Sequence, residues 1–140
     1  MTAVLCLLLA LAAGQTDNRR SEADPNRRAE QAVESADREL DAARQAWQGG
    51  DWDKSRAALG RMKDSAELAD SSLEQSTSQP RNNHHYKVVE LKLRMLIRRV
   101  DAFRLEVDYE QRDAVNAVET RLQELHDRIL DAVMTKRKKP

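Results

Sequence analysis

The sequence predicts an all-α protein, in which an antiparallel up-down-up-down four-helix bundle follows a cleavable N-terminal signal segment. Composition is the first reason, because 34% of the residues are charged, 4% are aromatic, and there are only four glycines and three prolines. The second reason is that apolar residues recur at alternating steps of three and four along four long segments, which is the spacing of one helical face. The third is an uncharged start, residues 1–14, ahead of a polar remainder.

Residues 1–14 carry no charged side chain and end in small residues, which is typical of a secretory signal peptide. The run is shorter than the roughly 20 apolar residues that span a bilayer, so we expect export to the periplasm or extracellular space and no transmembrane span. Cys6, the only cysteine, lies in this segment. No Lys or Arg precedes the apolar run, so the true start codon and the cleavage site, after Ala12 or after Gly14, stay open.

A first helix is predicted over 26–48, after a polar and flexible lead-in at 15–25. Pro25 suits the start of a helix, and Gly49-Gly50 suits its end because glycine adopts the left-handed conformation that closes helices. The predicted core positions are Ala29, Val33, Ala36, Leu40, Ala43 and Trp47.

A second helix is predicted over 51–75, with Asp51 as its N-cap. Gly60 lies inside this helix at a cost of about 1 kcal/mol relative to alanine, and we expect it to mark the close approach of a neighbouring backbone. The first two helices offer mainly alanine to the core and should pack closely together. The core positions of the second are Trp52, Ser55, Leu59, Met62, Ala66, Ala69 and Leu73.

A third helix is predicted over 84–107, after a polar loop that begins at Ser76. It carries a second apolar face, formed by Val88, Leu91 and Met95, so it is either the most buried helix or the one that meets a partner. Its core positions are Tyr86, Val89, Leu93, Leu96, Val100, Phe103 and Val107.

A fourth helix is predicted over 109–135 and completes a domain at 26–135. Asp108 and Gln111 have the spacing of a capping box, which favours a tight turn before this helix. One continuous helix of about 50 residues is the alternative. The core positions of the fourth helix are Val115, Val118, Leu122, Leu125, Ile129 and Ala132.

The segment from Gln48 to Ser55 reads Q-G-G-D-W-D-K-S and resembles the inter-helix turn of a tetratricopeptide repeat. The resemblance implies that Ser55 is the small residue at which the two helices touch, with Ala43 opposite and Leu59 as the next apolar position. It covers about 20 residues, departs at Met62, and is not repeated about 34 residues later. It therefore implies a single repeat-like hairpin and little about partners.

The sequence contains no pattern typical of an enzyme or a cofactor site. A haem attachment motif, inward Glu-x-x-His pairs and phosphate-binding glycine loops are all absent, so we predict no catalytic residues, no cofactor and no metal. The formal net charge is zero, whereas nucleic-acid-binding domains are usually basic, so we expect no nucleic-acid partner.

Three histidines are interpreted as surface residues. His84 and His85 are adjacent, but neighbouring side chains do not by themselves converge on one ion, so a metal site would need a further ligand. His126 is the only other histidine. The carboxylates are likewise interpreted as surface charges on the outer sides of helices.

A basic tail closes the chain at 136–140. Positive charge after a helix interacts favourably with the helix dipole, which is the simplest interpretation. Weak, salt-sensitive contact with an anionic envelope surface is the alternative. The charged residues are Lys136, Arg137, Lys138 and Lys139.

Together these observations favour a non-catalytic exported helical protein, with coiled-coil-like packing, that mediates protein–protein interaction or self-association. Val88, Leu91 and Met95 form its candidate partner face. The alternative is a periplasmic stress-type or metal-responsive helical chaperone.

Overall fold

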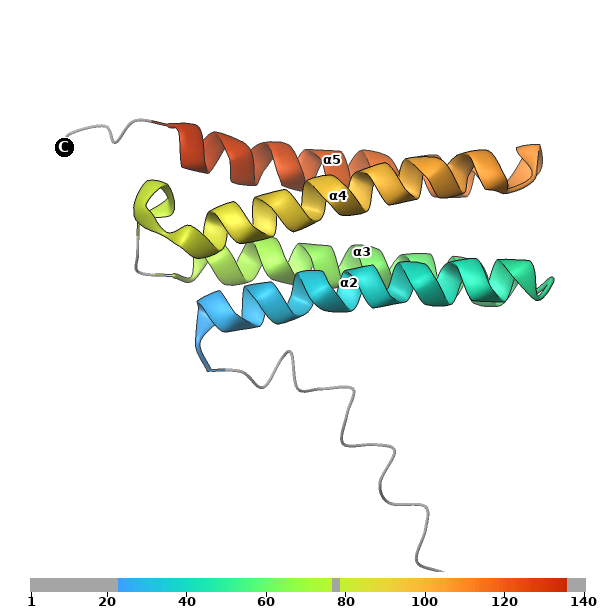
Figure 1. Cartoon of the computed structure of the whole chain (residues 1–140), viewed down its shortest axis with the longest axis horizontal. Coiled ribbons are helices and arrows are strands. Elements are labelled where there is room, and N and C mark those ends of the chain that lie inside the picture. Colours follow the sequence, from blue (N-terminus) through green and yellow to red (C-terminus); the bar gives the residue numbers. More distant parts are fainter. Residues whose placement is uncertain (1–22, 77–78, 136–140) are drawn as a thin grey trace, which may run out of the picture.

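The computed structural model describes residues 23–76 and 79–135, and within them it contains four long helices and no strand (Figure 1). The all-α prediction is thereby confirmed. The predicted signal segment, the basic tail and all of the lead-in before Ala23 lie outside the described residues. The helices are α2 (Pro25–Gln48), α3 (Trp52–Glu74), α4 (His84–Glu106) and α5 (Arg112–Met134), with short 3-10 turns η1 (Pro80–Asn82) and η2 (Tyr109–Gln111).

Capping residues determine where the first two helices begin. Asp24 precedes Pro25, and its carboxylate accepts a hydrogen bond from the backbone N–H of Asn26 at 3.0 Å. Asp51 accepts from the backbone N–H of Lys54 at 3.0 Å, as its predicted role as an N-cap requires. Between the helices Gly50 has a φ of +83°, a conformation that favours glycine.

A tight turn separates α4 from α5, so the continuous-helix alternative is excluded. Val107 and Asp108 are extended, η2 follows, and α5 begins at Arg112 rather than at the predicted residue 109. The side-chain oxygen of Gln111 accepts from the backbone N–H of Asp108 at 3.2 Å and from the indole N–H of Trp47 at 3.1 Å. The turn is therefore fastened to the end of α2.

The core has two different halves. The helices α2 and α3 bury seven alanines between them, whereas α4 and α5 bury larger side chains and no alanine. Small side chains let α2 and α3 approach closely, and the buried hydroxyl of Ser55 donates to the backbone carbonyl of Ala43 at 2.7 Å. The largest fully buried side chains include Phe103, Leu40, Leu59, Met62, Leu73, Leu93, Leu96, Leu122, Leu125 and Ile129.

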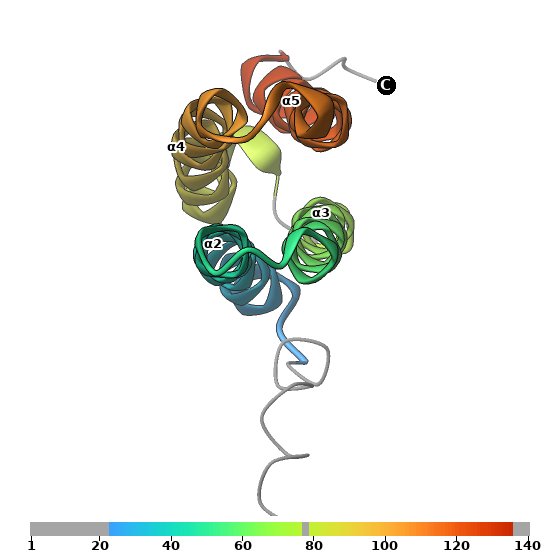
Figure 2. The same ribbon diagram turned by 90° about the vertical axis from the view of Figure 1, so that its right-hand side faces the viewer.

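The two hairpins, α2–α3 and α4–α5, are stacked on one another. Figure 2 shows the four helices at the corners of a square, with α2 beside α4, α3 beside α5, and α3 diagonally opposite α4. Helices within a hairpin run in opposite directions (Figure 1). Ion pairs between the hairpins advance in the same direction along both partners, so α2 runs parallel to α4 and α3 to α5. These pairs are Glu34–Lys92, Asp37–Arg99, Asp41–Arg99, Arg44–Glu106, Glu67–Arg121 and Glu74–Arg128.

Gly60 does not mark a close backbone approach, so that expectation was wrong. A Cβ added at Gly60 would meet no atom within 4 Å beyond its own helical surroundings. The absence of a side chain there is thus not required by packing among the described residues.

We predict that Gly60→Ala raises the free energy of unfolding by about 0.5–1 kcal/mol, because alanine restricts the unfolded chain and fits the open space. Gly50→Ala is the matched comparison and should lower stability, because its φ is left-handed. Urea denaturation followed by circular dichroism measures both. A destabilised Gly60→Ala variant would contradict the prediction.

Candidate functional site

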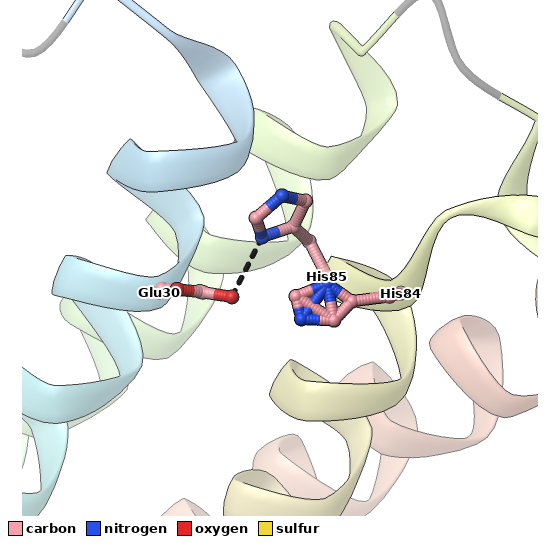
Figure 3. A group of neighbouring side chains, drawn as sticks. All are labelled: Glu30, His84 and His85. Atoms are coloured by element: carbon pink, nitrogen blue, oxygen red, sulfur yellow. Dashed lines mark hydrogen bonds and ion pairs between the residues drawn. The ribbon is translucent and has the colours of Figure 1, made fainter.

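Three potential metal ligands meet where the start of α4 lies against α2. In Figure 3 Glu30 extends from α2 toward His85, and the His84 ring lies beside them. The His85 Nδ1 atom is 2.6 Å from Glu30 Oε1, and the centroids of the two imidazole rings are 4.5 Å apart. One donor atom from each residue lies within 4.8 Å of the other two. Imidazole nitrogen with carboxylate oxygen is a donor set suited to zinc and similar divalent cations.

Asn83 holds the first turn of α4 in place. It is almost fully buried, and its side-chain oxygen accepts from the backbone N–H of His85 at 2.9 Å. Its amide nitrogen donates to Asn26 of α2 at 2.8 Å and to Ser76 at 3.2 Å. This one side chain therefore links the start of α4, the preceding loop and the start of α2.

The sequence pattern singles out His84 and His85 but gives no signal at Glu30. The pair Glu30 and His85 is separated by 55 residues, and only the parallel packing of α2 on α4 brings the two side chains together. The further ligand that the adjacent histidines needed is thus supplied by a different helix.

A second cluster is buried between α4 and α5. Glu90, only 8% exposed, accepts two hydrogen bonds from Arg94 at 3.0 and 2.8 Å, and its Oε1 atom lies 2.9 Å from His126 Nε2. The interpretation of the carboxylates as surface charges was therefore wrong for Glu90, and His126 is partly buried at the edge of the bundle. Glu90 follows the core residue Val89 and His126 follows Leu125, so both lie at the edge of the α4–α5 contact.

Two buried carboxyl groups at the contacts of α5 with its neighbours have altered pKa values. The hydrogen bond from Arg94 is the main reason that the pKa of Glu90 lies below its usual value of 4.5, and His126 lowers it further against the opposing effect of burial. Asp70 on α3 is also buried, and this burial raises its pKa although Arg128 lies 3.2 Å away. Both carboxyls hold neighbouring helices together.

The outer surface of α4 carries a further apolar face. Leu91 and Met95 are 50% and 56% exposed, whereas Val88 is partly buried. Steps of three and four continue this face to Leu105, 59% exposed, which the sequence analysis missed although it lies two heptads beyond Leu91. We call the whole set the outer seam: Val88, Leu91, Met95, Arg98, Ala102 and Leu105.

The surroundings of the outer seam are hollowed on one side and basic. A cavity of about 330 Å³ opens between α2 and α4, lined by Val33, Glu34, Asp37, Arg38, Lys92 and Met95. In the described part of the chain, Lys87 and Arg98 have no ion-pair partner, in contrast to Lys92 and Arg99, which pair with acidic residues of α2.

We predict that Glu90→Gln lowers the free energy of unfolding by about 1.5–3 kcal/mol at pH 7, because a charge-assisted hydrogen-bond network is lost. A carboxyl whose pKa is lowered by folding stabilises the protein above its ordinary pKa, and this contribution is lost as pH falls through the folded-state value. The difference between the two proteins should therefore shrink at about pH 3. Urea denaturation at both pH values measures it.

The control for this experiment is Glu110→Gln, which changes an exposed glutamate of η2. It should leave stability nearly unchanged at both pH values. An equal penalty for Glu90→Gln at neutral and acidic pH would show that its charge is not the source of the stabilisation.

No helix in the described ranges is long and apolar enough to cross a membrane. Comparisons with protein-family models, curated proteins and solved structures found no match to this chain.

Proposed function

We propose that this is an exported, non-catalytic helical protein that self-associates through the outer seam of α4. The observation that carries the proposal is that α4 has two apolar faces and the bundle covers one of them. Its inner positions, such as Leu93, Leu96 and Val100, are buried, while Leu91, Met95 and Leu105 are at least half exposed. A face of this kind is expected to be covered by a partner.

The spacing of the outer seam favours a helix as the partner. Its residues advance by steps of three and four, which is the spacing of the contact positions in a coiled coil. Arg98 occupies one of these positions, so an acidic side chain on the partner helix would complement it. The cavity next to Met95 provides room for a side chain from such a helix.

The helix that fits this description is α5 of a second copy. Its last turns expose Leu130 and Met134, and Asp131 between them has no ion-pair partner among the described residues. Pairing the outer seam with that of a second α4 would instead bring against each other two faces that both carry the positive charge of Arg98. In a symmetric dimer each α4 faces the partner's α5, so both exposed apolar surfaces are covered together.

The remaining parts of the proposal come from the sequence. Export rests on the uncharged segment 1–14 and on the lack of a thiol after Cys6. The up-down-up-down order is supported by the opposite directions of consecutive helices in Figure 1, and the tetratricopeptide-like first hairpin by the buried contact between Ser55 and Ala43. Contact of the basic tail with an anionic surface is a weaker, salt-sensitive addition.

We predict that the protein is a dimer whose dissociation constant rises by at least about tenfold in Met95→Glu, because a charge is then buried in the seam. Met134→Glu should weaken the dimer similarly, since α5 is the proposed occupant. Analytical ultracentrifugation of the full chain over a concentration series measures both. Circular dichroism checks that the helices are retained.

The control for self-association is Ala57→Glu, an exposed substitution on α3 that should leave the dimer unchanged. A strict monomer would overturn the proposal. A dimer sensitive to Met95→Glu but not to Met134→Glu would overturn the assignment of α5 as the occupant.

We further predict that the protein purified from its native host begins at Ala13 or Gln15, because a signal peptidase cleaves after small residues. Mass spectrometry of the intact protein measures this start. Mature protein that retains Met1 would contradict export by this route.

A further inference from the structure

We propose that Glu30, His84 and His85 form a binding site for a divalent transition-metal cation, with zinc as the best match. Two imidazoles and one carboxylate are a donor set that zinc uses when a fourth position is left to water. The site goes beyond the proposed function, because none of its residues belongs to the outer seam or to α5.

The three donor atoms need only small movements to bind one ion. Because they lie within 4.8 Å of one another, a common centre is at most about 2.8 Å from each of them. Zinc binds these donors at about 2.0–2.2 Å, so each atom must move by less than about 1 Å. The side chain of His84 is exposed on the first residue of α4, so it can rotate without disturbing the core.

The hydrogen bond between His85 and Glu30 occupies the place that the ion would take. Ionised Glu30 only accepts hydrogen bonds, so the proton in this contact belongs to His85 Nδ1. On metal binding Nδ1 becomes a ligand. A doubly protonated ring releases the Nδ1 proton to solvent. A ring that is already neutral changes tautomer and carries its one proton on Nε2.

Glu30 is the exception in a series of side-chain pairs between α2 and α4. The residues of α4 at intervals of seven face polar partners on α2: His85 contacts Glu30, Lys92 and Arg99 pair with acidic residues, and Glu106 pairs with Arg44. We call this series the α2–α4 ladder. Among the described residues Glu30 is the ladder carboxylate that has neither a lysine nor an arginine partner. A pair of imidazoles stands there instead, and imidazole, unlike ammonium or guanidinium, can bind a metal.

The surroundings hold the start of α4 against α2 before an ion arrives. Buried Asn83 fixes the backbone of His85 and is itself bonded to Asn26 on α2, the helix that carries Glu30. Metal sites depend on such outer contacts to keep their ligands oriented. Because the ligands come from two helices, bound metal would also tie the start of α4 to α2.

The test titrates the tag-free full chain with zinc chloride by calorimetry, and with cobalt(II) as a spectroscopic probe. We expect one ion per chain and a zinc-dependent rise in melting temperature. Glu30→Gln, His84→Ala and His85→Ala should each weaken binding by at least about tenfold. The matched control is His126→Gln, which removes the remaining histidine and should leave the affinity unchanged.

A second variant separates metal binding from a purely structural ion pair. His85→Lys places an ammonium group opposite Glu30, as at the Lys92 position of the ladder, so the fold should be retained. This variant should lose the zinc-dependent rise in melting temperature. Retention of the full rise, or zinc affinities equal in the original chain and the three ligand variants, would overturn the proposal.

Discussion

The rotation of α4 about its own axis is the constraint on which the rest of the structure depends. Burial of Leu93, Leu96 and Val100 turns one face inward, and the α2–α4 ladder determines which side faces α2. Individual exposed ion pairs contribute little, about 0–1 kcal/mol each, whereas buried apolar side chains contribute more. The ladder therefore acts mainly by selecting one rotation of α4 among those that the apolar core alone would allow. This rotation sets the histidines against α2, Glu90 against α5, and the outer seam toward the surface.

Local periodicity was enough to predict the elements of this fold. Every helix was found, because steps of three and four mark an apolar face and because Asp51 and Gly50 carry clear capping and turn signals. The same pattern indicated that the third helix has a second apolar face but left open whether that face is buried or meets a partner, and the structure leaves Leu91 and Met95 exposed. Such patterns identify which face is apolar, but they do not identify the helix that covers it.

The parts that sequence reasoning missed all depend on neighbours distant in the chain. Glu30 became a site residue only through the stacking of α2 on α4, and Glu90 met His126 only through the α4–α5 contact. One signal was present in the sequence. Basic residues or histidine at intervals of seven on the third helix have acidic counterparts on the first, which indicates that the two helices are neighbours and run parallel.

The attachment of Trp47 gives the bundle two ends of different chemical character. At one end an indole packs edge-on against Phe103, with ring centroids 6.1 Å apart, and bonds to the neutral amide of Gln111. At the other end α2 meets α4 through polar contacts, the imidazole–carboxylate pair of His85 with Glu30 and the amide pair of Asn83 with Asn26, with which water and dissolved ions compete. On heating, the helices should therefore separate first at the end where the histidines lie and last at the tryptophan end. A change of solution that loosens the histidine end would thus leave the fluorescence emission of Trp47 nearly constant.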